Sequence, residues 1–197
     1  MIHADLFQSL VTSGRHKKYI LFMTDTCTKN VELVALPNKE AETIADSIFL
    51  HWISRLGIPA EIITDQGKEF SNKLTDKLFQ LMEIKHSRTS AYHQQCNAQA
   101  EVANKTIAKF LRNQVDTSTL NWEMFLPPFM FSYNTLFHRT IQISPFFLTF
   151  GQNASQPFFN QEKVQCQFWK ENTTEEQFQI LQEAHQMAWK CSPSTIN

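Results

Sequence analysis

Three carboxylates stand out in this sequence: one lies within an expected strand, one directly follows a strand and one stands at a helix start, and an α/β chain exposes reactive groups at such strand ends and helix starts. Asp5 lies in the apolar run "IHADLF", Asp65 directly follows "EIIT", and Glu101 stands where the polar stretch "SAYHQQCNAQA" becomes helical. Strand ends and helix starts meet at one edge of an α/β sheet. Carboxylates that converge there repel one another unless cations bind them, and oxygen ligands of this kind suit Mg²⁺ or Mn²⁺.

A pair of divalent ions would give this trio a definite chemistry. Two ions about 3.5–4 Å apart activate an attacking oxygen and stabilise the leaving oxygen of an in-line phosphoryl transfer. Each acid also has a simpler explanation: Asp5 as an edge-strand charge, Asp65 as part of a common "DQG" turn, and Glu101 as a first-turn residue favoured by the helix dipole. The combination is more informative, because 35 residues, 66–100, separate the second acid from the third.

The elements that must position these acids alternate between strands and helices. Besides "IHADLF", β-rich apolar runs predict strands at "KKYILFMTD", "VELVALP", "AEIIT" and "IKHSRTS". One helix is expected from a cap at Asn38 to a stop at Gly57, and another from a cap at Ser71. The second helix should bury a stripe of Leu74, Leu78, Leu81 and Met82. This order implies an α/β domain with a mixed sheet.

The helices expected after the strands carry clear start and stop signals. One helix should run from about Asn97, and Pro127-Pro128 should start or kink the next. Ser144-Pro145 predicts a capped helix start, and Gly151 predicts its end. After about Pro157 the chain becomes polar and glutamine-rich. We therefore expect a core domain over residues 1–157, followed over 158–197 by a polar connector and a tail helix, "TEEQFQILQEAHQMAWK".

Composition limits the classes of protein that this chain can represent. Hydrophobic residues make up 42% and charged residues 19%, as in ordinary globular proteins. The net charge of -1 offers no bulk attraction to nucleic acid, so any DNA contact depends on local lysines or metal ions. The four cysteines lack zinc-site spacing, and no signal peptide or membrane-spanning run is evident. We expect a soluble intracellular chain.

Several ordered motifs resemble the catalytic core of retroviral and gypsy-type retrotransposon integrases, members of the ribonuclease H-like superfamily. "HADLFQSL" resembles the strand of the first aspartate, "ITDQGKEF" the turn of the second, and "AYHQQCNAQAEVANKTI" the loop and helix of the glutamate. "NWEMFLPPFMFSYNTLFHRT" and "SPFFLTFG" resemble the closing helices. The resemblance extends from about residue 1 to residue 157 and includes the 35-residue spacing.

The resemblance implies a fold, a reaction and partners. The fold would be a five-stranded mixed sheet flanked by helices. Asp5, Asp65 and Glu101 would bind two Mg²⁺ or Mn²⁺ ions, water would process DNA 3′ ends, and the 3′ hydroxyl would then attack target DNA. The partners would be element ends, target DNA and further copies of the chain, with no membrane. We expect a nuclear location and a fragment of a retroelement polyprotein.

Basic and polar residues around the third acid are candidates for DNA contact. Glu101, Lys105 and Lys109 recur every four residues and share one helix face. They could contact phosphates, or form a solvated face with salt pairs worth about 0.2–0.5 kcal/mol each. His93 and Asn97 could contact substrate, or make hydrogen bonds within their loop.

One further acid and two other functions compete with this interpretation. Asp25 also ends a strand, but the resemblance gives the corresponding acid no catalytic role, so we interpret it as a turn residue. The chain could be a catalytically silent domesticated remnant that binds nucleic acid or protein, or a metal-dependent ribonuclease. Gln94 and Ala98 stand where the family usually has Pro and Gly, which is compatible with a remnant. The intact acids favour catalysis, and the spacing favours an integrase.

Overall fold

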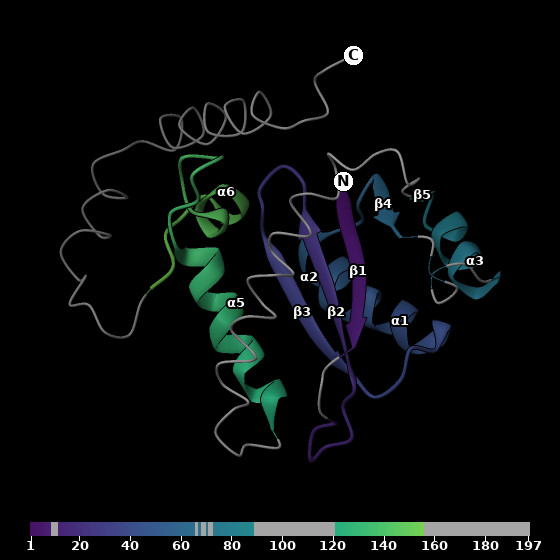
Figure 1. Ribbon diagram of the computed structural model, residues 1–197. Coiled ribbons are helices and arrows are strands. Elements are labelled where there is room, and N and C mark those ends of the chain that lie inside the picture. Colours follow the sequence, from purple (N-terminus) through teal and green to yellow (C-terminus); the bar gives the residue numbers. More distant parts are fainter. Residues whose placement is uncertain (9–11, 66, 68–69, 71–72, 89–120, 156–197) are drawn as a thin grey trace. The chain divides into compact units, whose positions relative to one another are not determined.

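The computed structural model describes residues 1–8, 12–65, 67, 70, 73–88 and 121–155 (Figure 1). The chain divides into two compact units. The first comprises Met1–Thr26 and Val31–Met130, and the second comprises Cys27–Asn30 and Phe131–Asn197. The first unit contains the sheet and two of the three predicted acids within its described residues.

A five-stranded sheet in the order β3-β2-β1-β4-β5 forms the first unit. Its strands are β1 (Ile2–Gln8), β2 (Tyr19–Asp25), β3 (Val31–Leu36), β4 (Glu61–Thr64) and β5 (Lys85–Arg88). β1, β2 and β3 pair antiparallel, whereas β4 pairs parallel to both β1 and β5. The antiparallel strands follow one another through short connections, and helices provide the longer crossovers that parallel pairing requires. The predicted mixed sheet is confirmed.

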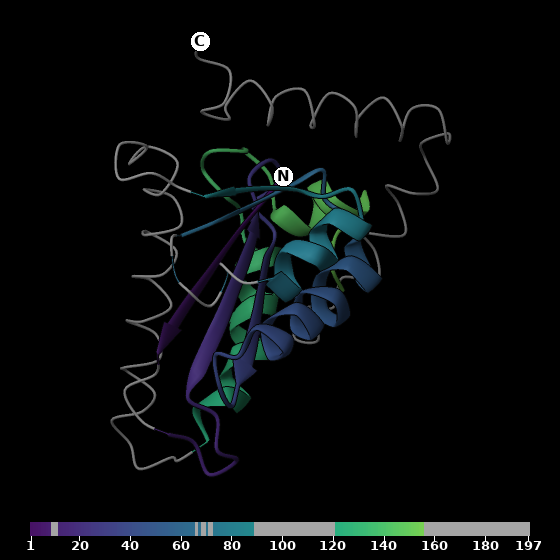
Figure 2. The ribbon, with the colours of Figure 1, turned by 90° about the vertical axis from the view of Figure 1, so that its right-hand side faces the viewer.

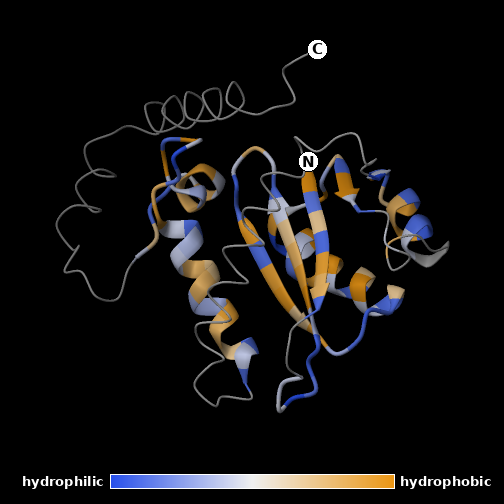
Figure 3. Cartoon of the chain, viewed as in Figure 1, coloured by the Kyte–Doolittle hydropathy of each residue, from blue (hydrophilic) through white to orange (hydrophobic). Residues whose placement is uncertain are grey.

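Helices cover one face of this sheet. They are α1 (Ala41–Ile48), the π-helix η1 (Phe49–Ile53), α2 (Ser54–Leu56) and α3 (Lys73–Leu81), and Figure 2 shows α1 and α3 on the same side of the strands. Alternate strand residues, including Ile2, Ala4, Leu21 and Met23, form a core with Ile44, Ile48 and Trp52 of this helical segment. Figure 3 shows the hydrophobic colour along the strands and alternating colours along α1.

Two details of these helices differ from the sequence predictions. Helix α1 begins at Ala41, and the side chain of Asn38 instead accepts a hydrogen bond from the Glu40 amide at 3.0 Å, before the helix starts. The predicted cap at Asn38 is therefore wrong, although Gly57 ends the segment as expected, with φ 92°. Leu81 is also wrong as a core residue, because it is 75% exposed.

Phe79 takes the core position on α3 that Leu81 was expected to share. Thr75 and Phe79 are buried, and Leu78 and Met82 pack against the same cluster. These positions lie three and four residues apart and therefore share one helix face. Leu81 lies on the flank of that face at the last residue of the helix. The predicted Ser71 cap lies outside the described residues.

The other face of the sheet carries a second set of buried side chains. Ile20 and Phe22 are fully buried there, on the side of β2 away from α1. Trp122 in the 3₁₀-helix η2 (Trp122–Phe125) is also buried, and the Leu33 amide lies 2.9 Å from Met130 Sδ of α5 (Leu126–Thr135). The prolines occupy the first turn of α5, where the missing amide hydrogens cost little. Their predicted role at a helix start is confirmed.

A short helix among the described residues of the second unit has two ends that match the sequence signals. Helix α6 (Pro145–Phe150) follows Ser144, whose hydroxyl accepts a hydrogen bond from the Phe147 amide at 3.1 Å. Gly151 ends the helix in the left-handed region, with φ 72°. Ile141 and Leu148 form a small buried cluster in this unit.

Some predictions fall on parts of the chain that the structure leaves undescribed. The helix expected from Asn97, the boundary after residue 157 and the tail helix all lie in residues 89–120 or 156–197. These remain predictions. None of the described helices has both the length and the apolar character needed to cross a membrane.

Candidate active site

Asp5 and Asp65 occupy neighbouring positions at the junction of β1 and β4. The parallel register pairs Ile2 with Ile62, His3 with Ile63, and Ala4 with Thr64. Each aspartate is the next residue after the last of these pairs. Because neighbouring strands lie about 4.8 Å apart, the register brings the two aspartate backbones side by side. The backbones of two acids that are far apart in the sequence thus lie next to each other.

Local hydrogen bonds orient both carboxylates. Asp5 Oδ1 accepts a hydrogen bond from the Leu6 amide at 2.8 Å, in the middle of β1. Asp65 Oδ1 accepts from the Gly67 amide at 3.0 Å, which is the Asx-type turn typical of Asp in this position. The turn that served as the simpler explanation of "DQG" is therefore present, and it also presents an exposed carboxylate beside β1.

The side chain of Asp25 lies on the opposite face of the sheet from that of Asp5, because side chains along a strand alternate between the two faces. It stands opposite Ile2, whereas Asp5 stands opposite Phe22 on the same pair of strands. Side chains an odd number of residues apart on a strand point to opposite faces. Asp25 shares the face of the Ile2 side chain, and its Oδ1 lies 3.9 Å from the N-terminal nitrogen of Met1. This geometry favours Asp5 over Asp25 as a partner of Asp65.

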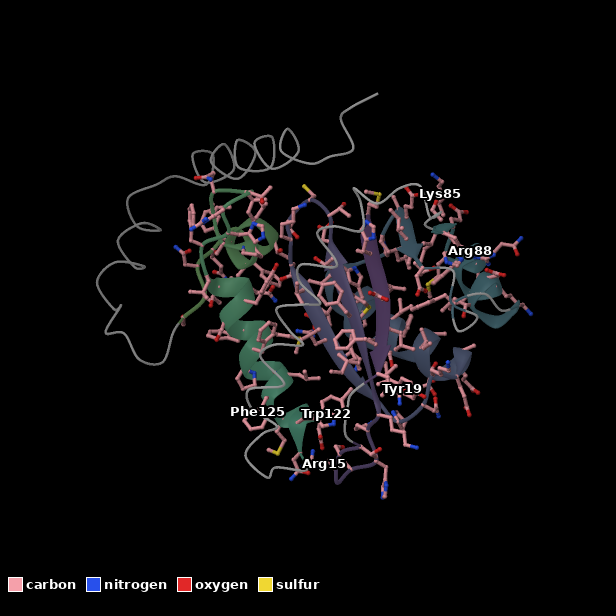
Figure 4. The ribbon with its side chains drawn as sticks, in the orientation of Figure 1. Arg15, Tyr19, Lys85, Arg88, Trp122 and Phe125 are labelled. Carbon is pink, nitrogen blue, oxygen red and sulfur yellow. The ribbon has the colours of Figure 1, made fainter. Side chains whose placement is uncertain are left out.

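Another carboxylate on β4 is engaged with β5. Glu61 Oε1 lies 3.0 Å from Lys85 Nζ, and it also accepts a hydrogen bond from the Ser87 hydroxyl. Although partial burial opposes it, these hydrogen bonds and the Lys85 charge lower the pKa of Glu61. Figure 4 shows Lys85 beside β5. Glu61 is the first residue of β4, and Asp65 directly follows its last residue. The two acids therefore lie at opposite ends of the strand.

Sequence reasoning missed Thr64, which directly precedes Asp65, and His86, which contacts Thr64. Thr64 is buried, and its hydroxyl contacts both the Asp65 carbonyl and the ring of His86. His86 was seen only as part of the strand "IKHSRTS". The sequence did contain one signal for this pair: Thr64 is a polar residue at the end of an apolar strand, and the next strand along the chain contains His86. That signal becomes specific only when the pairing of β4 with β5 is known.

Two carboxylates of the predicted trio fit a divalent metal ion. Carboxylate oxygens are the ligands that Mg²⁺ and Mn²⁺ prefer, and Asp5 and Asp65 carry them on neighbouring backbone positions. Within the described residues, no group of three or more His, Cys, Asp or Glu side chains is placed to hold a metal ion. Glu101 lies outside those residues, as do Lys105, Lys109, His93 and Asn97.

The chain is similar to integrase domains in both sequence and fold. Residues 1–94 match the family model described as integrase core domain. The chain is 27% identical over 153 residues to the retrovirus-related Pol polyprotein from transposon 412 of Drosophila melanogaster, covering 78% of this chain and 12% of that polyprotein. It is 29% identical over 157 residues to Gypsy retrotransposon integrase-like protein 1 of Bos taurus, covering 80% of this chain and 31% of that protein. The chain thus spans less than a third of the length of either relative.

Solved structures of integrases share this fold. The HTLV-2 integrase catalytic core domain in complex with magnesium, in a trimeric form, superposes with a TM-score of 0.58 at 22% identity, covering 74% of this chain and 92% of that domain. A chain of the simian T-cell lymphotropic virus intasome in complex with PP2A regulatory subunit B56 gamma gives a TM-score of 0.64 at 18% identity, covering 80% of this chain and 55% of that one. The expected ribonuclease H-like architecture is confirmed.

Proposed function

We propose that the chain is an integrase core domain of the retroviral and gypsy-retrotransposon type, which it resembles in sequence and fold, and that it catalyses metal-dependent DNA strand transfer as part of a retroelement polyprotein. The observation that carries the proposal is the register of β1 with β4, which sets Asp5 and Asp65 side by side after the Ala4–Thr64 pair. If either aspartate were absent, the other would have no second carboxylate beside it with which to bind a metal ion.

Asp5, Asp65 and Glu101 would hold two Mg²⁺ or Mn²⁺ ions. When bound, the ions would supply activation of an attacking oxygen and stabilisation of the leaving oxygen. Asp5 comes from a strand with neighbours on both sides, so its position is held by the sheet. Asp65 is held by its turn to Gly67. Both ligands are thus held by the surrounding backbone, as is needed where a metal site depends on a fixed ligand geometry. The magnesium complex of the HTLV-2 core domain supports this choice of metal.

The substrate would be DNA, both as element ends and as target. Lys105 and Lys109 would contact phosphates, and His93 and Asn97 would contact the strand near the metal ions, all from the segment that contains Glu101. The chain would act as a homo-oligomer in the nucleus. The trimeric form of the HTLV-2 domain and the simian viral intasome support an oligomer.

The reaction can be tested with purified protein in Mn²⁺. A branched oligonucleotide that mimics the joined product is a suitable substrate, since reversal of strand transfer needs the same in-line phosphoryl transfer but no recognition of element ends. We expect strand cleavage and rejoining by the wild type, and only background activity from Glu101→Gln. Lys39→Gln is a matched control, because Lys39 is an exposed residue of the β3–α1 connection.

Two results would contradict the proposal. Equal activity in Glu101→Gln would remove the third acid from the site. A wild type that folds but shows no metal-dependent activity would favour the catalytically silent remnant instead. In that case the protein would be tested for metal-independent binding of DNA by fluorescence anisotropy.

A further inference from the structure

Thr64 connects the peptide of Asp65 to a histidine on the neighbouring strand. Its hydroxyl oxygen lies 3.0 Å from the Asp65 carbonyl oxygen, to which it donates, and 3.0 Å from His86 Nε2. Thr64 is 1% exposed, so a hydroxyl left without partners there would be costly. The residue directly before a proposed metal ligand is therefore held by a buried hydrogen bond.

His86 is itself held from two sides. The side chain is 10% exposed, and its ring stands edge-on to Phe79 of α3, with centroids 5.0 Å apart. His86 Nδ1 lies 3.4 Å from Asp76 Oδ1 of α3, and Arg88 Nη2 lies 3.5 Å from the same oxygen. Figure 4 shows Arg88 beside α3 and β5. The His86 ring thus has the ring of Phe79 and the ion pair of Asp76 with Arg88 as its neighbours.

The hydrogens that Thr64 and His86 carry decide which of them donates in their contact. A hydroxyl has one hydrogen to donate and can accept as well. While Thr64 donates that hydrogen to the Asp65 carbonyl, it can only accept from His86. His86 Nε2 must then carry a proton. Burial is the largest influence on His86 and lowers its pKa, so the ring is neutral at neutral pH and its one proton lies on Nε2. Nδ1 then has no proton, so its 3.4 Å contact with Asp76 Oδ1 is not a hydrogen bond, and Asp76 pairs with Arg88.

We infer that His86 is a positioning residue for the metal site, acting through the Thr64 hydroxyl to hold the Asp65 peptide in place. The inference rests on the proposed function of Asp65 as a metal ligand. His86 and Thr64 lie on the face of the sheet that α3 covers, whereas Asp5 faces the other way. His86 thus supports the ligand from behind and does not bind the metal.

Such supporting contacts have measurable effects. Partners that orient metal ligands typically change metal affinity or activity by about 10–100-fold when they are removed. His86 acts on the backbone of the ligand and not on its carboxylate, so we expect the lower end of that range, about tenfold. The effect should follow the hydrogen-bond donor and not the volume of the ring.

Two matched pairs of variants separate the hydrogen bond from the packing. His86→Leu removes the donor, whereas His86→Gln keeps an N–H near the position of Nε2. Thr64→Val removes the hydroxyl at nearly constant shape, whereas Thr64→Ser keeps it. Circular dichroism and thermal melting of all four variants check that each one folds.

The first measurement needs neither metal nor activity. NMR of the metal-free protein gives the solvent-exchange rate of the Gly67 amide, which donates to Asp65 Oδ1. We expect His86→Leu and Thr64→Val to raise this rate severalfold and to leave the amide of Leu21, in the core of β2, unchanged. His86→Gln and Thr64→Ser should stay close to the wild type.

The second measurement is Mn²⁺ binding by calorimetry. We expect about tenfold weaker binding in His86→Leu and Thr64→Val, with most of the affinity restored in the Gln and Ser variants. Equal behaviour of all four variants and the wild type in both measurements would overturn the positioning role. Equal losses within each pair would overturn it too, because packing alone would then account for them.

The proposed function can fail separately from the positioning role. If the wild type binds no Mn²⁺, the metal site is wrong and the inference falls with it. If the wild type binds Mn²⁺ and acts on DNA while the variants match it, only the role of His86 is wrong.

Discussion

Asp5 and Asp25 lie on opposite faces of the sheet, although their strands are hydrogen-bonded neighbours. The antiparallel register sets Asp5 opposite Phe22 and Asp25 opposite Ile2. Both acids belong to apolar strands, and both could bind a metal on the evidence of residue type alone. The strand register favours Asp5 as the metal ligand, because only Asp5 lies next to Asp65 where β1 pairs parallel with β4.

Replacing each of these acids should therefore have different consequences. We expect Asp5→Asn to abolish Mn²⁺-dependent cleavage of the branched DNA and to weaken Mn²⁺ binding at least tenfold, in line with the loss of a direct ligand. Asp25→Asn should retain most of both properties, because its carboxylate is near the N-terminal nitrogen of Met1 and away from Asp65. Calorimetry and the cleavage assay measure the two effects. Loss of activity in Asp25→Asn, with Asp5→Asn active, would reverse the assignment.

Much of this fold could be predicted because the informative patterns are local. The continuous apolar run in "YILFMTD" and the cap and stop of α6 depend on a few adjacent residues, and the structure confirms them. Asn38 and Leu81 were wrong because helix ends depend on tertiary packing as well as on cap-forming residues. A capping residue such as Asn38 does not by itself fix where a helix begins, and a leucine such as Leu81 does not by itself show which side of a helix packs against the sheet.

The candidate site was predictable in part for a related reason. The type and order of the acids were visible in the sequence, but the pairing of β1 with β4 joins segments far apart in the chain. His86 was missed because its hydrogen-bond partner Thr64 lies on another strand, and Phe79, against which its ring packs, lies on a helix. Hydrogen bonds between separate elements leave no periodic pattern in the sequence, so only the structure brings them together.

The core beneath the proposed site should tolerate little loss of volume. Leu21 is fully buried in the cluster between the sheet and α1, so Leu21→Ala should destabilise the protein by about 2–5 kcal/mol through lost burial and a cavity. Leu50 is 59% exposed in the π-helix, and Leu50→Ala should change stability by less than about 0.5 kcal/mol. Urea unfolding measures both values. Similar values for the two variants would mean that Leu50 is covered in solution or that Leu21 is not part of a packed core.

The start of α6 provides a test in the second unit. Ser144→Ala removes the hydroxyl that accepts from the Phe147 amide, so it should cost about 1 kcal/mol of stability. Ser144→Asp should retain most of that stability, because a carboxylate also caps a helix and interacts favourably with its dipole. Thermal unfolding compares the three proteins. A destabilised Ser144→Asp with a stable Ser144→Ala would show that the cap does not form in solution.

Glu32 should make stability depend on pH in a direction unusual for a salt-bridged acid. Its carboxylate lies 3.1 Å from Arg55 but its side chain is only 9% exposed, and burial outweighs the arginine and raises the pKa of Glu32. Between the unfolded and folded pKa values the folded state therefore binds more protons than the unfolded state. Stability from this group is then present below about pH 4.5 and is lost as the pH rises through the folded pKa.

The stability of the wild type relative to Glu32→Gln should accordingly fall as the pH rises from about 4 to 7, by about 1.4 kcal/mol for each unit of pKa shift. Arg55→Met should extend this decline to higher pH, because the guanidinium that lowers the pKa of Glu32 is gone. Urea unfolding of the three proteins at a series of pH values measures the differences. A relative stability that instead rises with pH would show that the ion pair with Arg55 outweighs burial, and that Glu32 is a stabilising anion in the folded protein.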